Sequence, residues 1–215
     1  MTDARAVIFD MDGVIVDSES RHERAFLQVV KELGYGDNHG LDFDNYIGRS
    51  DRDLWVDFVA RHKPAQDLEV LLAMKRARVL EILRRDRPLF DGLSELVEKL
   101  ALKYRLAIAS GSEPQVVEEV LSFNSLRRFF SVVTTSSEVK HGKPAPDIFL
   151  RASRLLGVDP GECWVIEDSK PGVAAGLAAG MRVIAITNTH PAKELKNATH
   201  VVATYEEIAD ILLNH

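Results

Sequence analysis

The chain has 215 residues, with 27 Lys and Arg against 33 Asp and Glu, and its formal net charge is −6. This length can bury one good core and excludes several large domains. A mildly acidic chain lacks the overall positive charge that binds the phosphate backbone of a nucleic acid. Any anionic ligand would therefore have to be bound by a local group of cations and backbone dipoles. A single cysteine, Cys163, excludes an internal disulfide framework and a cysteine-rich zinc site.

The apolar content also limits the location of the protein. No apolar run is long enough to span a bilayer. The first residues lack the basic and then apolar organisation of a signal peptide. We therefore expect a cytoplasmic protein that binds neither membrane nor nucleic acid, with a monomer as the default state.

Six short apolar runs predict the strands of one sheet. None of them alternates apolar with polar residues, which is typical of strands buried on both faces in a parallel sheet. Helical periodicity lies between most of them, as in Leu93, Leu96, Val97 and Leu100. The alternation predicts an α/β fold with a doubly wound parallel sheet. The runs are 6–9, 106–109, 132–134, 164–166, 183–186 and 201–203.

One stretch interrupts this alternation. Between Asp17 and Arg87 no strand is predicted, and apolar spacing indicates helices around 26–33 and 54–59. One or two further helices are expected between 68 and 83. We therefore predict a small helical domain of residues 17–88, inserted into a core domain of residues 1–16 and 89–215.

Polar residues cluster directly after the predicted strands. In a parallel sheet the carboxyl ends of the strands share one edge, where open α/β folds bind their ligands. The groups expected to converge there are Asp10 and Asp12, then Ser110, Gly111 and Ser112, then Lys143, then Glu167 and Asp168.

The chemistry of these groups suits phosphoryl transfer. Asp10, Asp12 and Asp168 would repel one another unless a cation joined them, and oxygen ligands favour Mg²⁺. Ser110, Lys143 and the backbone amides of residues 111–112, ahead of a helix near 114, would seat an anion. One carboxylate would attack and the other would move protons.

These residues resemble the four motifs of the haloacid dehalogenase-like hydrolase superfamily. The motifs are residues 10–14, Ser110, Lys143 within 142–147, and residues 167–169, and they occur in order across residues 5–187. The resemblance implies a Rossmann-like core, and the predicted helical insert matches the position and character of that family's small cap domain.

The resemblance also implies roles for individual residues. Asp10 matches the nucleophile that forms a phosphoaspartate, and Asp12 matches the acid/base. Ser110 and Lys143 match the residues that hold the transferring phosphoryl group. Asp168 matches a Mg²⁺ ligand, together with Asp10 and the backbone carbonyl of Asp12. Glu167 is expected either to support these ligands without touching the ion or to contact the ion through a water.

Asp12 also separates activities within the superfamily. The dehalogenases lack this second aspartate as a rule, so its presence favours phosphate chemistry. Phosphonate-cleaving relatives need a cap lysine, and none of Lys31, Lys63 and Lys75 is expected in a loop that faces the core. That activity is therefore disfavoured.

Within the superfamily, residues 9–18 and 167–173 resemble the β-phosphoglucomutase and sugar-phosphatase branch. His22 matches a histidine that senses substrate in the mutase. Ile47 and Glu113 stand where the mutase carries lysines, so the chain lacks positive charge that a bisphosphate intermediate would need. These departures favour a phosphatase acting on a small phosphate ester such as a sugar phosphate.

Alternatives remain at this point. A phosphosugar mutase is the first. A receiver-like signalling module, which also combines acids, a hydroxyl group, a lysine and Mg²⁺, is the second, although receivers are shorter and lack the insert. Arg49 and Arg52 are candidates for reading the leaving group, and they and His22 could equally be solvated surface charges.

Overall fold

The computed structural model describes residues 5–36, 38–46 and 51–214. Within them, six parallel strands form one sheet in the order β3-β2-β1-β4-β5-β6. Every strand overlaps one of the predicted apolar runs, so the predicted doubly wound parallel sheet is confirmed. The strands are β1 (Ala6–Phe9), β2 (Arg105–Ser110), β3 (Phe130–Thr135), β4 (Cys163–Glu167), β5 (Arg182–Ile186) and β6 (His200–Val202).

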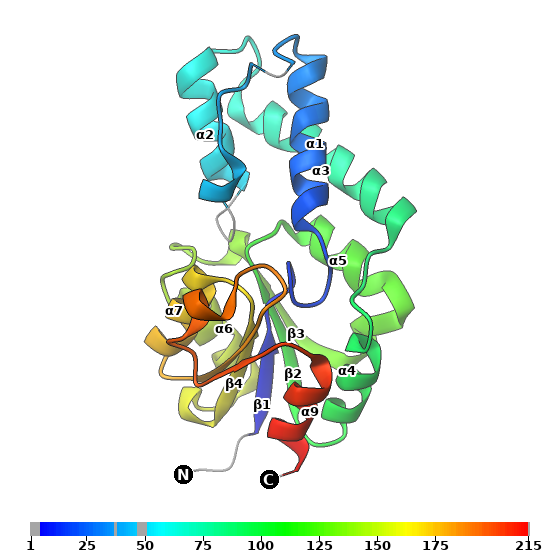
Figure 1. Cartoon of the computed structure of the whole chain (residues 1–215), viewed down its shortest axis with the longest axis vertical. Helices are drawn as coiled ribbons and strands as arrows, with labels where there is room; N and C mark the ends of the chain where they lie inside the picture. The colour runs from blue at the N-terminus through cyan, green and yellow to red at the C-terminus, as the bar shows by residue number, and fades with distance from the viewer. Residues whose placement is uncertain (1–4, 37, 47–50, 215) are drawn as a thin grey trace.

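Helices cover both faces of this sheet (Figure 1). Val7 and Phe9 of β1 pack into the apolar layer beneath α4 (Leu93–Ala101), α5 (Pro114–Ser122) and α9 (Tyr205–Leu213). Ala6 and Ile8 point the other way, into the layer beneath α6 (Asp147–Leu156) and α7 (Lys170–Ala178). The alternation of side chains along a strand thus explains why a continuous apolar run is needed. Shorter elements are η1 (Phe43–Asn45), η2 (Phe123–Phe129), η3 (Ser136–Glu138), η4 (Pro160–Glu162) and α8 (Ala192–Leu195).

Three helices form the predicted insert and lie over the carboxyl ends of the strands (Figure 1). They are α1 (Glu19–Glu32), α2 (Asp51–His62) and α3 (Leu68–Asp86). They bury an apolar cluster of their own around Phe26, Trp55 and Phe58, whose rings pack against one another. Helix α3 is one continuous helix where the pattern allowed one or two, and Asp67 caps it by accepting a hydrogen bond from the Val70 amide.

The chain enters and leaves this helical segment through two connections that run side by side. Val16 forms a bridge with Leu89, and the Asp17 amide donates a 2.9 Å hydrogen bond to the Pro88 carbonyl. The predicted domain boundary falls at this pair of connections and stays a prediction. Among the described residues, no helix combines the length and the apolar character that crossing a membrane requires.

Candidate active site

The loop after β1 carries Asp10 and Asp12 and passes very close to the loop after β4. Gly13 makes this approach possible. Its φ is +78°, a conformation that favours glycine, and a Cβ atom there would lie 1.8 Å from Asp168 Oδ2. The glycine therefore lets the two acidic loops meet at the carboxyl edge of the sheet.

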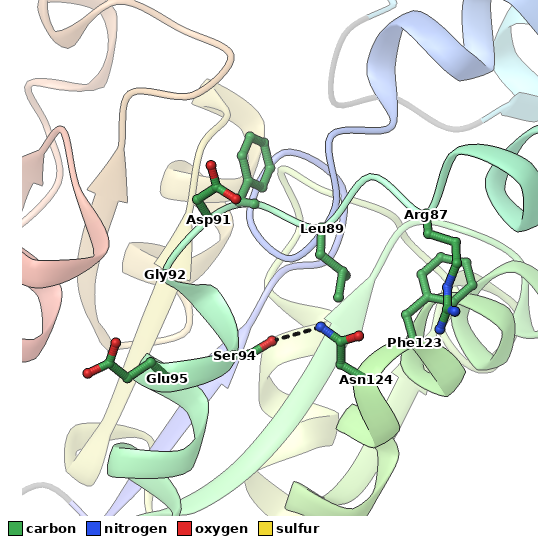
Figure 2. Close-up of a pocket in the computed structure, with 9 residues that line it drawn as sticks. Arg87, Leu89, Asp91, Gly92, Ser94, Glu95, Phe123 and Asn124 are labelled. Carbon is green, nitrogen blue, oxygen red and sulfur yellow. Dashed lines mark hydrogen bonds between the residues drawn. The ribbon is translucent and has the colours of Figure 1, made fainter.

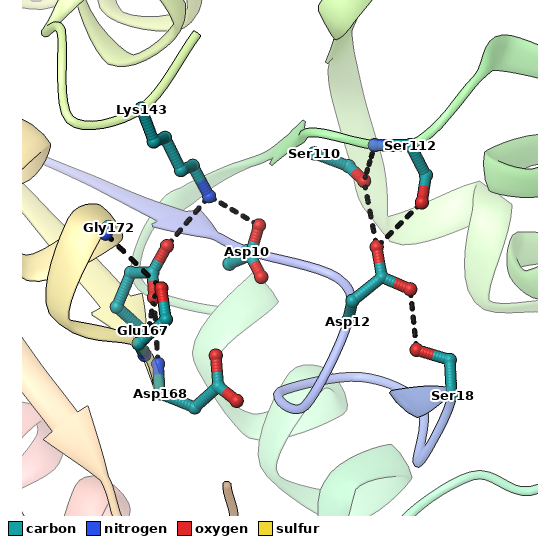
Figure 3. A network of polar contacts seen from close by, with 10 residues as sticks. Asp10, Asp12, Ser18, Ser110, Ser112, Lys143, Glu167, Asp168 and Gly172 are labelled. Atoms are coloured by element: carbon teal, nitrogen blue, oxygen red, sulfur yellow. Dashed lines mark hydrogen bonds and ion pairs between the residues drawn. The ribbon is translucent and has the colours of Figure 1, made fainter. Parts of the chain in front are cut away.

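Lys143 joins the two acidic loops through direct contacts (Figure 3). Its Nζ donates to Asp10 Oδ1 at 2.5 Å and to Glu167 Oε1 at 2.7 Å. Burial alone would lower the pKa of Lys143, but the carboxylates of Asp10 and Glu167 outweigh burial and raise this pKa above its usual range. Lys143 is therefore a buried cation held between two acids.

Glu167 is fully buried and locked in place by its own loop. Its Oε2 accepts hydrogen bonds of 2.9 Å from the Asp168 amide, the Ser169 amide and the Ser169 hydroxyl. Gly172, in the first turn of α7, leaves the room for this carboxylate, because a Cβ atom there would lie 1.7 Å from Glu167 Oε1. The sequence at the start of α7 thus fixes the position of Glu167.

The carboxylates of Asp10, Glu167 and Asp168 form a buried cluster that fits a divalent cation. One oxygen of each lies within 4.8 Å of the others. Burial, followed by the charges of neighbouring carboxylates, raises the pKa of Asp168 well above its usual range. The pKa of Asp10 is raised in the same way, against the opposing effect of Lys143. Three carboxyl groups and one lysine leave an excess of negative charge. Mg²⁺, which prefers oxygen ligands, would neutralise it.

Asp12 points away from this cluster, toward Ser18, Ser110 and Ser112 (Figure 3). Its carboxylate accepts hydrogen bonds from Ser18 Oγ at 2.5 Å, Ser112 Oγ at 2.8 Å and Ser110 Oγ at 3.4 Å. His22 Nε2 lies 3.6 Å from Asp12 Oδ1. Burial would raise the pKa of Asp12, but His22 and the serine hydroxyls outweigh burial and lower it. Asp12 is thus an ionised group beside, and not within, the acidic cluster.

The predicted anion seat after β2 is formed only in part. Gly111 and Ser112 line the pocket, whereas Ser110 is fully buried behind them. The Ser112 amide donates a 3.0 Å hydrogen bond to Ser110 Oγ, so this amide is engaged within its own loop. A phosphoryl group bound here would have to compete with this internal hydrogen bond.

A pocket of about 980 Å³ opens between these loops and the helical insert. Asp10, Asp12, Lys143 and Asp168 line it from the sheet side. The structure therefore brings most of the predicted catalytic and metal-binding residues to one pocket, large enough for a small phosphate ester.

The three residues predicted to contact substrate differ in where the structure places them. His22 lines the pocket and stands next to Asp12. Arg52 also lines it, but its guanidinium pairs with Glu69 and its side chain is 56 % exposed. Arg49, together with Ile47, lies outside the described residues.

Lys75 of α3 is a pocket residue that the sequence does not single out. The prediction concerns only cap lysines in a loop that faces the core, and Lys75 reaches the pocket from a helix, where it is 1 % exposed. Its Nζ donates to Asp51 Oδ1 and lies 3.1 Å from His22 Nδ1. A sequence signal exists, because Lys75 lies four residues from both Leu71 and Val79, on the buried face of the helix. Lys31 and Lys63 are exposed.

Asp51, at the start of α2, completes this group and was also missed. Burial would raise its pKa, but Lys75 and His22 hold the pKa of the Asp51 carboxyl well below its usual range. His22 responds in the opposite sense. Burial and Lys75 disfavour its charged form, yet hydrogen bonds and charges from Asp12 and Asp51 raise its pKa to about 9. Acids and cations therefore alternate along a connected set of four side chains, which are Asp12, His22, Asp51 and Lys75.

A smaller cavity of about 400 Å³ lies where the chain returns from the insert to the sheet (Figure 2). Arg87 stacks over the Phe123 ring at 5.0 Å, and Asn124 Nδ2 donates to Ser94 Oγ at 3.3 Å. None of the predicted site residues lines this cavity. The chemistry therefore belongs to the larger pocket.

Comparison with known proteins agrees with this geometry. The family model described as "Haloacid dehalogenase-like hydrolase" matches residues 7–186. Hexitol phosphatase B of Escherichia coli (strain K12) is 33 % identical over 213 residues, which cover 97 % of this chain and 91 % of that protein. Fructose-1-phosphate phosphatase YqaB of the same strain is 34 % identical over 182 residues, covering 83 % of this chain and 94 % of that protein.

Among solved structures, a mutant of CbbY from Rhodobacter sphaeroides in complex with xylulose-(1,5)bisphosphate superimposes with a TM-score of 0.83. It is 25 % identical, and the match covers 95 % of this chain and 96 % of that chain. The fold and the acidic pocket are those of a hydrolase, and the chain belongs to the haloacid dehalogenase-like hydrolase family. The family match and its phosphatase relatives confirm the expected enzyme class, a phosphoric monoester hydrolase of this family.

Proposed function

We propose that this protein is a Mg²⁺-dependent phosphatase that hydrolyses a small sugar or sugar-alcohol phosphate through a phosphoaspartate on Asp10. The observation that carries the proposal is the placement of Asp10 between two differently charged surroundings. On one side lie Lys143 and the acidic cluster, and on the other lies the separately hydrogen-bonded Asp12. One carboxylate can then attack while the other handles protons.

Asp10 and Asp168 would hold the cation together with the Asp12 backbone carbonyl. Glu167, whose oxygens accept hydrogen bonds from Lys143 and from its own loop, would act from outside these ligands or through a water. When bound, Mg²⁺ would neutralise negative charge on the phosphoryl oxygens, which three carboxylates alone would repel. Lys143 adds a second positive charge next to Asp10. The pairing of Lys143 with Asp10 and Glu167 holds this charge in place before substrate arrives.

The first chemical step breaks the bond between phosphorus and the leaving oxygen. An Asp10 oxygen attacks phosphorus, and Asp12 gives its proton to the leaving alkoxide. Asp12 is ionised in the free site, so it must first take up a proton from solvent. A phosphate dianion bound beside it supplies the negative charge that raises its pKa.

The second step returns the enzyme to its starting state. With the leaving group gone, Asp12 removes a proton from water, and the hydroxide attacks the phosphorus of the phosphoaspartate. Phosphate leaves, the Asp10 carboxylate is restored, and Asp12 releases its proton to solvent. Ser18, Ser110 and Ser112 donate hydrogen bonds to Asp12 and would keep its carboxylate oriented through both steps.

The substrate class follows from the pocket and the relatives. The insert, which we take to be a cap of residues 17–88, encloses the pocket and would exclude bulk water. The two Escherichia coli relatives are named for hexitol and fructose 1-phosphate, and the CbbY structure holds a sugar bisphosphate. A sugar-sized leaving group therefore suits this site. We expect the enzyme to act in the cytoplasm.

Phosphate release from a panel of hexitol, hexose and pentose monophosphates and an aryl phosphate tests the proposal. We expect release that requires Mg²⁺, stops with EDTA and is lost in Asp10→Asn. The matched control is Asp159→Asn, an exposed aspartate ahead of β4 at the opposite end of the sheet, which should retain activity. Isomerisation of a hexose phosphate without net release would indicate the mutase instead. A stable phosphoprotein without turnover would indicate a signalling module.

A further inference from the structure

The part of the pocket between Asp12 and the insert would hold the leaving group. The charged side chains that line this part of the pocket are paired with one another. Because Asp12 protonates the leaving oxygen, the carbon chain of the substrate must begin at Asp12 and extend toward the insert. His22 is the next side chain, 3.6 Å from Asp12 and 3.7 Å from Asp51 Oδ1. Asp51 and Lys75 therefore stand where the distal hydroxyl groups of a sugar would lie.

Lys75 and Asp51 depend on each other. Lys75 is 1 % exposed, and a buried ammonium group is costly unless a counter-charge accompanies it. Among the described residues, the carboxylate that contacts Lys75 Nζ is that of Asp51. If Asp51 were neutral, Lys75 would be a buried cation in need of an anion, and a second phosphate entering the pocket would supply one.

The other cations that the insert brings to the pocket are paired as well. Arg52 contacts Glu69, and Arg76 of α3 contacts Glu113 of the sheet domain. Within the described part of the chain, every pocket-lining basic side chain of the insert thus has an acidic partner. The insert side of the pocket therefore offers donors and acceptors to hydroxyl groups but no unpaired charge to a second phosphate. Lys140, which also lines the pocket, belongs to the sheet domain and not to the part of the pocket around Lys75 and Asp51.

We propose, on the basis of the function proposed above, that Asp51 is a specificity-determining residue. It cancels the charge of Lys75, so the pocket takes a neutral, hydroxyl-bearing leaving group and rejects one that carries a second phosphate. The Asp51 carboxylate accepts hydrogen bonds from hydroxyl groups, and Lys75 donates to their oxygens. A phosphate in the same place would meet the Asp51 charge at close range, without a net cation to offset it.

A binding experiment in the Asp10→Asn background tests this without turnover. The probes are glucitol 6-phosphate and glucitol 1,6-bisphosphate, which differ by one phosphate, and calorimetry in the presence of Mg²⁺ gives both Kd values. We expect the monophosphate to bind at least about tenfold more tightly. Adding Asp51→Asn should move the ratio of Kd values by about tenfold or more toward the bisphosphate, because it leaves Lys75 unpaired.

Variants of opposite sign keep the test decisive even if Asp51→Asn folds poorly. Lys75→Gln removes the lysine partner of Asp51, leaves His22 as its remaining cationic neighbour and should move the ratio further against the bisphosphate. The double variant, Asp51→Asn with Lys75→Gln, should return close to the parent ratio. The matched control is Asp91→Asn, which removes the same charge from an exposed position outside the pocket and should leave the ratio unchanged.

Failure of this inference differs from failure of the proposed function. Equal or tighter binding of the bisphosphate to the parent protein, a ratio that does not respond to Asp51 and Lys75, or binding of neither probe would overturn the role of Asp51. If the ratios follow the charges but wild-type protein releases no phosphate from glucitol 6-phosphate, the specificity stands and the phosphatase proposal falls.

Discussion

The hydroxyl group of Tyr205 donates a 2.7 Å hydrogen bond to the carbonyl oxygen of Val14, 191 residues earlier in the chain. Asn188 joins this contact, because its Nδ2 donates to Gly13 O at 2.8 Å and to the Tyr205 hydroxyl at 3.0 Å. The start of α9 and the loop after β5 therefore hold the turn that carries Asp12. The catalytic loop is positioned from the opposite end of the chain.

Replacing Tyr205 by Phe should lower both stability and turnover. The variant leaves the buried Val14 carbonyl without its donor, at a cost of about 1–2 kcal/mol and a fall in Tm of several degrees. We expect kcat to fall by about tenfold with little change in KM, since the loop holds Asp12 less firmly.

Tyr104→Phe is the matched control for this prediction. Its hydroxyl also donates to a backbone carbonyl, that of Leu212, but Tyr104 precedes β2 at the far end of the sheet. Thermal unfolding should show a smaller loss of stability, because Lys103 Nζ still donates to the Leu212 carbonyl at 3.0 Å, and kcat should be unchanged. Equal kcat in the two variants would show that the Tyr205 contact does not position the active-site loop.

Gly172→Ala should disable the acidic cluster. An added Cβ atom would lie 1.7 Å from Glu167 Oε1, so Glu167 or the start of α7 must move. Overpacking of this kind costs about 1–3 kcal/mol, and we expect Mg²⁺-dependent activity to be lost. Gly161→Ala is the control, because its Cβ atom would meet no atom within 4 Å. Wild-type Mg²⁺ dependence in Gly172→Ala would contradict the role given to Glu167.

Asp168→Asn should change stability in opposite directions with and without the cation. In EDTA the substitution removes one of three mutually repelling carboxylates, so Tm should stay the same or rise. In Mg²⁺ the wild-type protein should gain stability, by about 2.7 kcal/mol at a hundredfold excess over Kd, and the variant should gain much less. Thermal scans in both buffers measure this. An equal Mg²⁺ response in both proteins would place the cation elsewhere.

Cys163 should be inert in the folded protein. Burial raises the pKa of its thiol to about 11, and the side chain stays protonated at neutral pH. Because this pKa lies above the ordinary value of 9.0, any stability linked to the thiol is present below pH 9 and lost as pH rises toward 11. Titration with a disulfide reagent at pH 8 should detect the thiol only after unfolding. Rapid labelling of native protein would contradict the buried placement.

The strands and the core of the site could be predicted from the sequence because both depend on local signals. Asp10, Lys143 and Asp168 follow apolar runs, and parallel pairing brings their ends to one edge. The contacts that tune the site depend on residues distant in sequence. Arg52 is a candidate for reading substrate, and the sequence gives no sign that Glu69, 17 residues away, pairs with it.

The pocket lining contributed by the insert illustrates the same limit. Lys75 lies on the buried stripe of α3, and only the packing of α1 and α2 against that helix shows that its neighbours are His22 and Asp51. Tyr205 likewise carries no motif, and its role follows from the return of the last helix to the β1 loop. Residues that act through tertiary contacts need the fold before they can be found.

The central claim is that Asp10 carries the phosphoryl group during turnover. The most direct measurement is borohydride reduction of protein quenched with acid while it turns over glucitol 6-phosphate in Mg²⁺, followed by peptide mass spectrometry. Reduction converts an aspartyl phosphate to homoserine, and we predict homoserine at position 10, with none in the EDTA control. Turnover with unmodified Asp10, or homoserine at another aspartate, would contradict the account.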